Sequence, residues 1–175
     1  MKITLIRHTS VDVPPGMCYG QTDVPLKASF EQEAELVAQA LQGLSFDKVF
    51  TSPLSRCVRL ADYCGYAGAQ RDDRLKELNF GRWEMQAFEE IDDPHLQVWM
   101  DDYFNVPTPD GESFRMQLER LIDFFEDLKD QPYRHVAIFA HGGILTCAQL
   151  YSGDINLQEA FAIQTPYGGI VNILI

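Results

Sequence analysis

The sequence predicts an α/β fold in which a mostly parallel sheet lies between two layers of helices. Short apolar segments alternate with amphipathic helical segments along the chain, and this alternation is typical of parallel sheets covered on both faces. Polar side chains follow several of the apolar segments directly. The 175 residues suffice for one hydrophobic core and are few for two, so residues 1–175 are expected to form a single domain.

The strands are expected where short segments are apolar and rich in β-branched residues, or where the alternation requires a strand. They are residues 2–7, 47–51, 70–71, 136–140 and 170–175. The carboxyl ends of parallel strands meet at one edge of a sheet, and functional groups gather there. Arg7 and His8 end or follow the first strand, Thr51 and Ser52 the second, and His141 the fourth. We therefore expect these side chains to lie close together.

The helices are expected where apolar side chains recur at helical spacing. They are residues 28–44, 53–63, from 111–113 to 128, and from 141–143 to 151. Ser52 suits the N-cap of the second helix and Pro53 its first position. Residues 73–109 mix aromatic with acidic side chains and are expected to form short helices beside the site.

Composition limits the partners that the chain can take. Its net charge is −12 and its isoelectric point is near 4.6, which disfavours nucleic acid and acidic membranes because the field repels polyanions. The first residues do not resemble a signal peptide and no apolar run approaches the ~20 residues of a membrane helix, so a cytoplasmic location is expected. The four cysteines lack metal-ligand spacing and are expected to be reduced. No metal or cofactor is expected, and the sequence indicates no oligomeric state.

Arg7 and His8 are the first residues that suggest chemistry. One interpretation is structural, with an arginine in a surface ion pair and a histidine that caps the sheet. The functional hypothesis is that the His8 imidazole attacks phosphorus, while a backbone carbonyl holds its other ring nitrogen and keeps the attacking nitrogen unprotonated. A phosphohistidine would form, and water would hydrolyse it.

Two further basic residues are candidates for binding phosphate. Arg56 lies one helical turn after the second strand, where a guanidinium can bind two phosphate oxygens, although a structural role is equally consistent. His141 precedes two glycines that allow close approach, at a helix start that directs amide N–H groups at an anion; a buried core histidine is the alternative. His95 and His135 lie beside charged or loop residues and are expected to be structural.

A carboxyl group is needed as well, because the leaving oxygen of an ester needs a proton and the attacking water then needs a base. One carboxylic acid can serve in both steps. Glu77 is the candidate, and Glu84 is the competitor nearby.

Taken together, these segments resemble the histidine phosphatase superfamily, also called the phosphoglycerate mutase-like family. The motifs that carry the resemblance are, in order, Arg7-His8, Ser52-Pro-Leu-Ser-Arg56, Glu77-Leu-Asn-Phe-Gly81 and His141-Gly142. The resemblance spans essentially the whole chain and implies a three-layer α/β/α sandwich. It implies that His8 is the nucleophile and that Glu77 is the proton donor and later the base. It also implies that Arg7, Arg56 and His141 form the phosphate pocket.

Further segments are similar to the α-ribazole phosphatase branch of this superfamily. They are Arg7-His-Thr9, Cys18-Tyr-Gly-Gln-Thr-Asp-Val-Pro-Leu26, Phe80-Gly-Arg-Trp-Glu84 and Pro109-Asp-Gly-Glu-Ser113. This similarity implies a small phosphate ester as partner, namely α-ribazole 5′-phosphate or its corrinoid-attached form in cobalamin biosynthesis. A phosphatase for sugar phosphates or other small esters, a phosphoglycerate mutase and a catalytically silent binding protein are the alternatives. Met85 departs from the family, which often has glycine there.

Thr9, Gln21 and Glu112 are second candidates for substrate contact, at the edge of the pocket. Hydrogen bonds within loops are the alternative for Thr9 and Gln21, and a favourable charge in the first turn of a helix is the alternative for Glu112. Several aromatic side chains could stack on a flat base or belong to the core. They are Phe80, Trp83, Phe88, Trp99, Tyr103 and Phe104.

Overall fold

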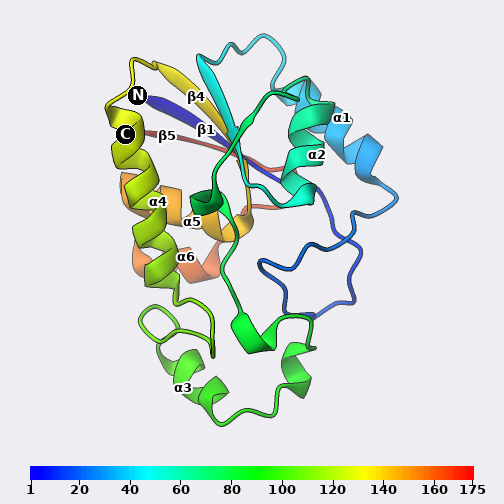
Figure 1. The fold of residues 1–175 in the computed structure, drawn as a ribbon, viewed down its shortest axis with the longest axis vertical. Helices are drawn as coiled ribbons and strands as arrows, with labels where there is room; N and C mark the ends of the chain where they lie inside the picture. The colour runs from blue at the N-terminus through cyan, green and yellow to red at the C-terminus, as the bar shows by residue number, and fades with distance from the viewer.

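The computed structural model describes residues 1–175, apart from the side chain of residue 161. Within these residues one five-stranded sheet has the order β3-β2-β4-β1-β5 (Figure 1). The strands are β1 (Lys2–Arg7), β2 (Lys48–Thr51), β3 (Gln70–Arg71), β4 (His135–Ala140) and β5 (Ile170–Leu174). Neighbouring strands run parallel except that β5 pairs antiparallel with β1 at one edge. The predicted mostly parallel sheet is confirmed.

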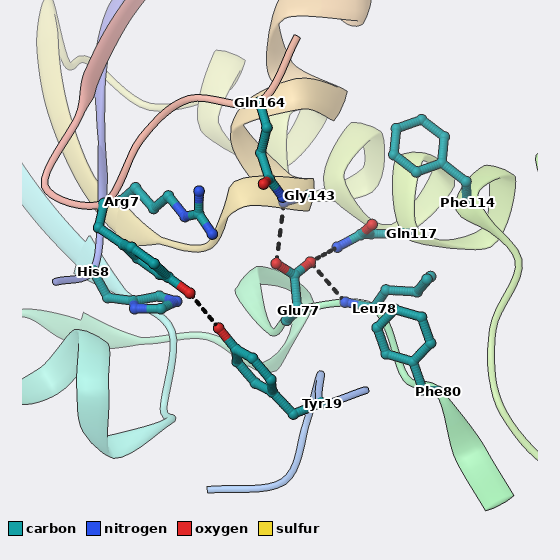
Figure 2. Close-up of a pocket in the computed structure, with 11 residues that line it drawn as sticks. Arg7, His8, Tyr19, Glu77, Leu78, Phe80, Phe114, Gln117, Gly143 and Gln164 are labelled. Atoms are coloured by element: carbon teal, nitrogen blue, oxygen red, sulfur yellow. Dashed lines mark hydrogen bonds between the residues drawn. The ribbon is translucent and has the colours of Figure 1, made fainter. Parts of the chain in front are cut away.

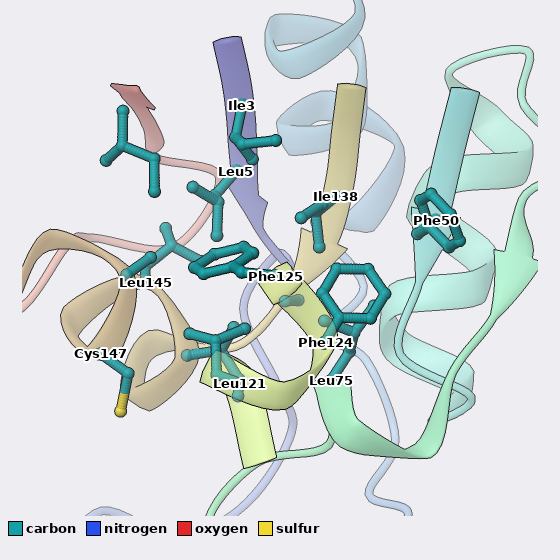
Figure 3. Close-up of a cluster of buried hydrophobic side chains, with 14 of the residues drawn as sticks. Ile3, Leu5, Phe50, Leu75, Leu121, Phe124, Phe125, Ile138, Leu145 and Cys147 are labelled. Atoms are coloured by element: carbon teal, nitrogen blue, oxygen red, sulfur yellow. The ribbon is translucent and has the colours of Figure 1, made fainter. Parts of the chain in front are cut away.

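Helices cover both faces of the sheet. They are α1 (Phe30–Ala40), α2 (Ser55–Tyr63), α3 (His95–Asp101), α4 (Phe114–Lys129), α5 (Gly142–Ser152) and α6 (Leu157–Ala162). On one face Leu5 belongs to a buried cluster with Phe125 of α4 and Leu145 of α5 (Figure 3). The next residue along β1, Ile6, belongs to the opposite cluster with side chains of α1 and α2 such as Leu60. Successive side chains of a strand point to opposite faces, so both are buried and the layers number three.

The end of helix α1 and the start of helix α2 differ from the sequence prediction. Helix α1 ends at Ala40 rather than at residue 44, because Gly43 adopts a left-handed φ of 79° and turns the chain toward β2. Helix α2 begins at Ser55, since Leu54 is extended, and the carboxylate of Asp23 accepts hydrogen bonds from the Ser55 amide and hydroxyl. The predicted cap at Ser52 is therefore wrong.

Helix α6 was not predicted from the sequence. It has only six residues, and its signal is a capping box in which the Asn156 side chain accepts from the Glu159 amide and the Glu159 carboxylate accepts from the Asn156 amide.

Residues 73–112 leave the sheet and lie beyond the end at which β1 and β4 finish (Figure 1). They form α3 and three single-turn 3₁₀ helices, Asp73–Leu75, Gly81–Trp83 and Phe88–Glu90, as expected. Trp83, Ile91 and Cys18 give this region a small hydrophobic cluster of its own. The four cysteines are free, and no helix in the described part of the chain is long and apolar enough to cross a membrane.

Candidate active site

The nucleophile candidate follows directly from the end of β1. The Arg7 amide donates to the Gly169 carbonyl at 2.9 Å, and the His8 amide donates to the Ala140 carbonyl at 3.1 Å. The Gly168 amide donates to the His8 carbonyl at 3.1 Å. The backbone of His8 is thus fixed between the end of β4 and the loop that precedes β5, and its side chain is buried, with 2% of its surface exposed.

The His8 ring is held in one tautomer. Its Nδ1 lies 2.8 Å from the Thr9 carbonyl oxygen, so Nδ1 carries the proton that it donates and Nε2 keeps a free electron pair. Burial lowers the pKa of His8 to about 3, and the positive charges of Arg56 and Arg7 act in the same direction. The imidazole is therefore neutral near pH 7, with one nitrogen able to act as a nucleophile.

Arg56 and His141 are fully buried beside His8. Arg56 Nε donates to His141 Nδ1 at 3.3 Å, and His141 Nε2 lies 2.7 Å from the Ser52 hydroxyl oxygen. The rings of His8 and His141 meet edge to face with centroids 5.2 Å apart. Burial, then the charge of Arg56, holds the pKa of His141 well below its ordinary value. The segments after β1, β2 and β4 thus converge as the sequence predicted.

Glu77 faces this group from residues 73–112. Its carboxylate accepts hydrogen bonds from the Leu78 amide at 2.9 Å, from Gln117 Nε2 at 2.8 Å and from the Gly143 amide at 3.1 Å (Figure 2). A Cβ atom at Gly143 would lie 2.3 Å from Glu77 Oε1. The second glycine after His141 therefore makes room for a carboxylate.

Glu84 does not compete with Glu77 for this place. Its carboxylate accepts hydrogen bonds from several groups of two neighbouring loops, namely the amides of Gly20, Gln21, Thr22 and Phe80 and the Thr22 hydroxyl. Burial alone would raise the pKa of the Glu84 carboxyl, but these hydrogen bonds hold it below its ordinary value. Glu84 is a structural anchor of the loop after β1.

A cavity of about 330 Å³ opens in front of these groups. It is lined by Arg7, His8, Tyr19, Glu77, Leu78, Phe80, Phe114, Gln117, Gly143, Gln164 and Tyr167 (Figure 2). Arg7, His8 and Glu77 thus share one cavity, whereas Arg56 and His141 lie behind its wall.

Sequence reasoning missed several of the lining residues. Gln117 had a recognisable signal, because it is a polar residue on the buried face of α4 between Phe114 and Leu121. Gln164 and Tyr167 belong to the loop before β5, whose pattern points to no particular chemistry.

Thr9, Gln21 and Glu112 do not line the cavity, although the sequence placed them at its edge. The Thr9 carbonyl holds His8, and Gln21 Nε2 donates to the Glu77 carbonyl at 3.0 Å. Glu112 lies outside the helix that follows it, and its carboxylate pairs with Arg120 at 2.8 Å. All three hold the residues that face the cavity.

Among the aromatic side chains proposed to stack on a base, only Phe80 lines the cavity. Trp83 belongs to the small buried cluster with Cys18 and Ile91, Phe88 and Trp99 pack against that cluster, and Tyr103 contacts Trp99. Phe104 packs against Phe114. The core alternative thus describes all six, since Phe80 packs against the small cluster as well as lining the cavity.

The remaining histidines lie outside the site. His135 bonds the Thr4 hydroxyl at 2.9 Å, at the opposite end of the sheet, and His95 bonds the Pro107 carbonyl. No group of three or more His, Cys, Asp or Glu side chains in the described part of the chain could hold a metal ion.

Comparison with known proteins agrees with this geometry. Residues 3–175 match the histidine phosphatase superfamily (branch 1). The adenosylcobalamin/alpha-ribazole phosphatase of Escherichia coli is 29% identical, over 83% of this chain and 76% of that protein. Phosphoserine phosphatase 1 of Hydrogenobacter thermophilus is 25% identical, over 79% of this chain and 69% of that protein. The solved structure of the alpha-ribazole phosphatase from Shigella flexneri, 24% identical, has the same fold, with a TM-score of 0.89 over 100% of this chain and 91% of that one. The predicted α/β fold and phosphatase class are confirmed, and the chain belongs to the histidine phosphatase superfamily.

Proposed function

We propose that this protein removes phosphate from a small monoester through a phosphohistidine at His8, and that the ester is α-ribazole 5′-phosphate or its corrinoid-attached form. The His8 imidazole carries the proposal. Its Nδ1 is engaged by the Thr9 carbonyl, which leaves Nε2 unprotonated, and its ring lines one cavity with Arg7 and Glu77.

In the first step, His8 Nε2 attacks phosphorus and the bond between phosphorus and the ester oxygen breaks. The protonated Glu77 carboxyl gives its proton to the leaving oxygen. Arg7, with Arg56 behind the wall, offsets the negative charge that develops on the phosphoryl oxygens.

In the second step, the Glu77 carboxylate takes a proton from water, whose oxygen attacks phosphorus. The bond between His8 Nε2 and phosphorus breaks, inorganic phosphate leaves, and the neutral imidazole and the protonated Glu77 are restored.

Part of the cavity lining is apolar, and this favours a substrate whose leaving group is flat and uncharged. Leu78, Phe80 and Phe114 present apolar surface, on which an aromatic base can pack. Besides His8, Arg7 and Glu77 are the basic and acidic side chains among the described residues that line the cavity, and the proposed phosphate transfer uses both. Phosphoserine and phosphoglycerate each carry a carboxylate that would need a further cation when buried.

A phosphate-release screen tests the substrate. We expect kcat/KM for α-ribazole 5′-phosphate to exceed that for phosphoserine, 3-phosphoglycerate and fructose bisphosphate by at least about tenfold, which corresponds to 1.4 kcal/mol. A preference for a sugar phosphate or for phosphoserine would contradict the assigned substrate and leave the chemistry at His8 untouched.

Trapping tests the nucleophile. Substrate labelled in its phosphate is mixed with enzyme and quenched without acid, and the protein is then analysed for bound label. The label is expected in the wild type and absent from His8→Ala, whose kcat falls by about 10⁴-fold or more. His135→Ala is the matched control because His135 lies at the opposite end of β1. Label that persists in His8→Ala rules out the assignment.

A further inference from the structure

Two tyrosines meet at the cavity in front of the nucleophile. Tyr19 comes from the loop after β1 and Tyr167 from the loop before β5, and their hydroxyl oxygens lie 2.7 Å apart. The dashed line that leaves the Tyr19 hydroxyl in Figure 2 marks this hydrogen bond. Both residues line the cavity that holds His8 and Glu77. The two-step chemistry at His8 does not itself require this pair, so its position calls for an explanation.

Tyr167 packs on the phosphate-binding end of the site. The guanidinium carbon of Arg7 lies 4.2 Å from the centroid of the Tyr167 ring, and the His8 ring centroid lies 5.5 Å from it. Arg7 Nη1 also donates to the Thr165 carbonyl in the same loop. The cation and the ring attract each other, so Tyr167 occupies the space directly over the first phosphate ligand.

Tyr19 stands in the same relation to the second arginine. Its ring centroid lies 5.6 Å from the guanidinium carbon of Arg56. Tyr19 lines the cavity whereas Arg56 does not, so the Tyr19 ring lies on the cavity side of Arg56. A phosphate group bound beside His8 and Arg7 would therefore lie against the Tyr167 ring, next to the hydrogen bond that joins the two tyrosine hydroxyls.

We propose that Tyr19 and Tyr167 are phosphate-binding residues: when the ester enters, their mutual hydrogen bond breaks and both phenol groups donate to non-bridging oxygens of the phosphate. The proposal rests on the proposed phosphate transfer at His8. A hydrogen bond from a hydroxyl to an anionic oxygen is roughly twice as strong as one between neutral groups, so the exchange favours the bound state. Burial raises the pKa of Tyr19, which keeps its hydroxyl protonated and able to donate.

The pair would also select among esters. A phosphate monoester presents three non-bridging oxygens, enough for Arg7, Tyr19 and Tyr167 together, whereas a diester presents two. The three donors therefore favour a phosphate monoester dianion as the class of substrate.

The experiment removes each hydroxyl and keeps the ring. In Tyr19→Phe and Tyr167→Phe we expect KM for p-nitrophenyl phosphate and the inhibition constant of inorganic phosphate to rise together by about tenfold or more, with kcat much less affected. Tyr63→Phe is the matched control, since its exposed hydroxyl bonds Glu35 on the outer surface of α1 and α2 and both constants should stay at wild-type values. Thermal unfolding verifies that each variant is folded.

Two outcomes of the inhibition measurement overturn the proposal. Unchanged phosphate inhibition in both variants means that the hydroxyls do not bind phosphate, and tighter inhibition means that the pair merely obstructs the site. A second measurement needs no variant: in protein labelled with ¹³C at tyrosine Cζ, saturating inorganic phosphate should shift the resonances of Tyr19 and Tyr167 and leave that of Tyr63 in place. Two unmoved resonances also overturn it.

The trapping experiment keeps the two proposals apart. If labelled phosphate fails to attach to His8 in the wild type, the proposed function fails. If it attaches and the phenylalanine variants bind inorganic phosphate as the wild type does, only the tyrosine proposal fails.

Discussion

The two walls of the active site are built by different means. Arg7, His8 and His141 stand at the ends of β1 and β4, whose register pairs Arg7 with Ala140. Glu77 instead comes from residues 73–112, which contain no strand and only short helices. We call the side that carries Arg7 and His8, with His141 buried behind it, the first wall, and the side that carries Glu77 the second wall. The sheet positions the first wall, and hydrogen bonds from side chains outside the sheet position the second.

Hydrogen bonds from one arginine show how the second wall is held. Arg120 of α4 donates to the carbonyls of Arg74 and Glu77 and forms an ion pair with Glu112, whose other oxygen accepts from the Asn79 amide. The acidic residues of this region thus have two different roles. Glu112, like Glu84, binds loop backbone, and Glu77 faces the cavity. Substitutions in one wall should therefore affect the protein differently from substitutions in the other.

Within the second wall, the largest effect on kcat is expected at Glu77, and this change tests whether the second wall supplies the proton. In Glu77→Gln, kcat for an alkyl phosphate should fall by about 10²- to 10⁴-fold. With p-nitrophenyl phosphate, whose leaving group needs no proton, the first step should survive and water attack should fail. Stopped-flow measurement should then show a burst of about one p-nitrophenolate per enzyme.

The control for this experiment is Glu89→Gln, an exposed carboxylate in the same region, which should keep wild-type turnover. Wild-type kcat for the alkyl ester in Glu77→Gln would show that the proton comes from elsewhere.

The next effect should come from Arg120→Met, which breaks the second wall without touching the first. Arg120 and Glu112 are 17% and 16% exposed, so leaving Glu112 unpaired should lower the free energy of unfolding by about 3 kcal/mol in urea titration. We expect kcat to fall while the inhibition constant of inorganic phosphate stays near its wild-type value.

Arg82→Met is the matched control, because the Arg82–Asp110 pair is 68% and 77% exposed and should contribute at most about 1 kcal/mol. If Arg120→Met weakens phosphate inhibition as much as it lowers kcat, the two walls are not independent.

The same contrast explains what the sequence could predict. Arg7, His8 and His141 follow apolar strand segments, and the rules for parallel sheets bring strand ends to one edge, so their convergence follows from local patterns. Gln21 and Glu112 bind the backbone around Glu77 through contacts between distant residues, and no local pattern separates such an anchor from a substrate ligand.

Tyr167 could not be predicted for a related reason. Its place over Arg7 depends on the loop before β5 folding back onto β1, and this is a tertiary arrangement. At Ser52 a local pattern is misleading. A serine before proline is typical of a helix cap, yet the Ser52 hydroxyl bonds His141.

The free energy of unfolding should depend on pH through His8, which belongs to the first wall. His8 in the unfolded chain binds a proton with a pKa near 6.5, whereas the folded pKa is lowered to about 3. Below pH 6.5 the unfolded state binds more protons, so the folded state loses stability as the pH falls toward 3. Between pH 7.5 and 5.5 this loss is about 1.4 kcal/mol for one histidine.

Urea titrations at the two pH values measure it. The decrease in the free energy of unfolding should be smaller in His8→Asn than in the wild type by about 1.4 kcal/mol. An equal decrease in both proteins would mean that His8 accepts a proton in the folded state near its ordinary pKa.

The smallest effect is expected at Met85, in the second wall. Met85 holds a left-handed φ of 63°, with its amide bonded to the Cys18 carbonyl at 2.7 Å. A side chain with a Cβ costs roughly 1–2 kcal/mol in this conformation, whereas glycine does not, although glycine also adds freedom to the unfolded chain. Met85→Gly should therefore raise the free energy of unfolding by less than about 1 kcal/mol, and Met85→Ala, which keeps the Cβ, should not.

Because Met85 does not line the cavity, neither variant should change kcat/KM. If Met85→Gly raises stability and leaves kcat/KM unchanged, the departure from the glycine common in the family is a cost to the loop backbone alone. If kcat/KM changes as well, the turn at Met85 helps to position Glu77, and the second wall then extends from Arg120 to the loop after Trp83.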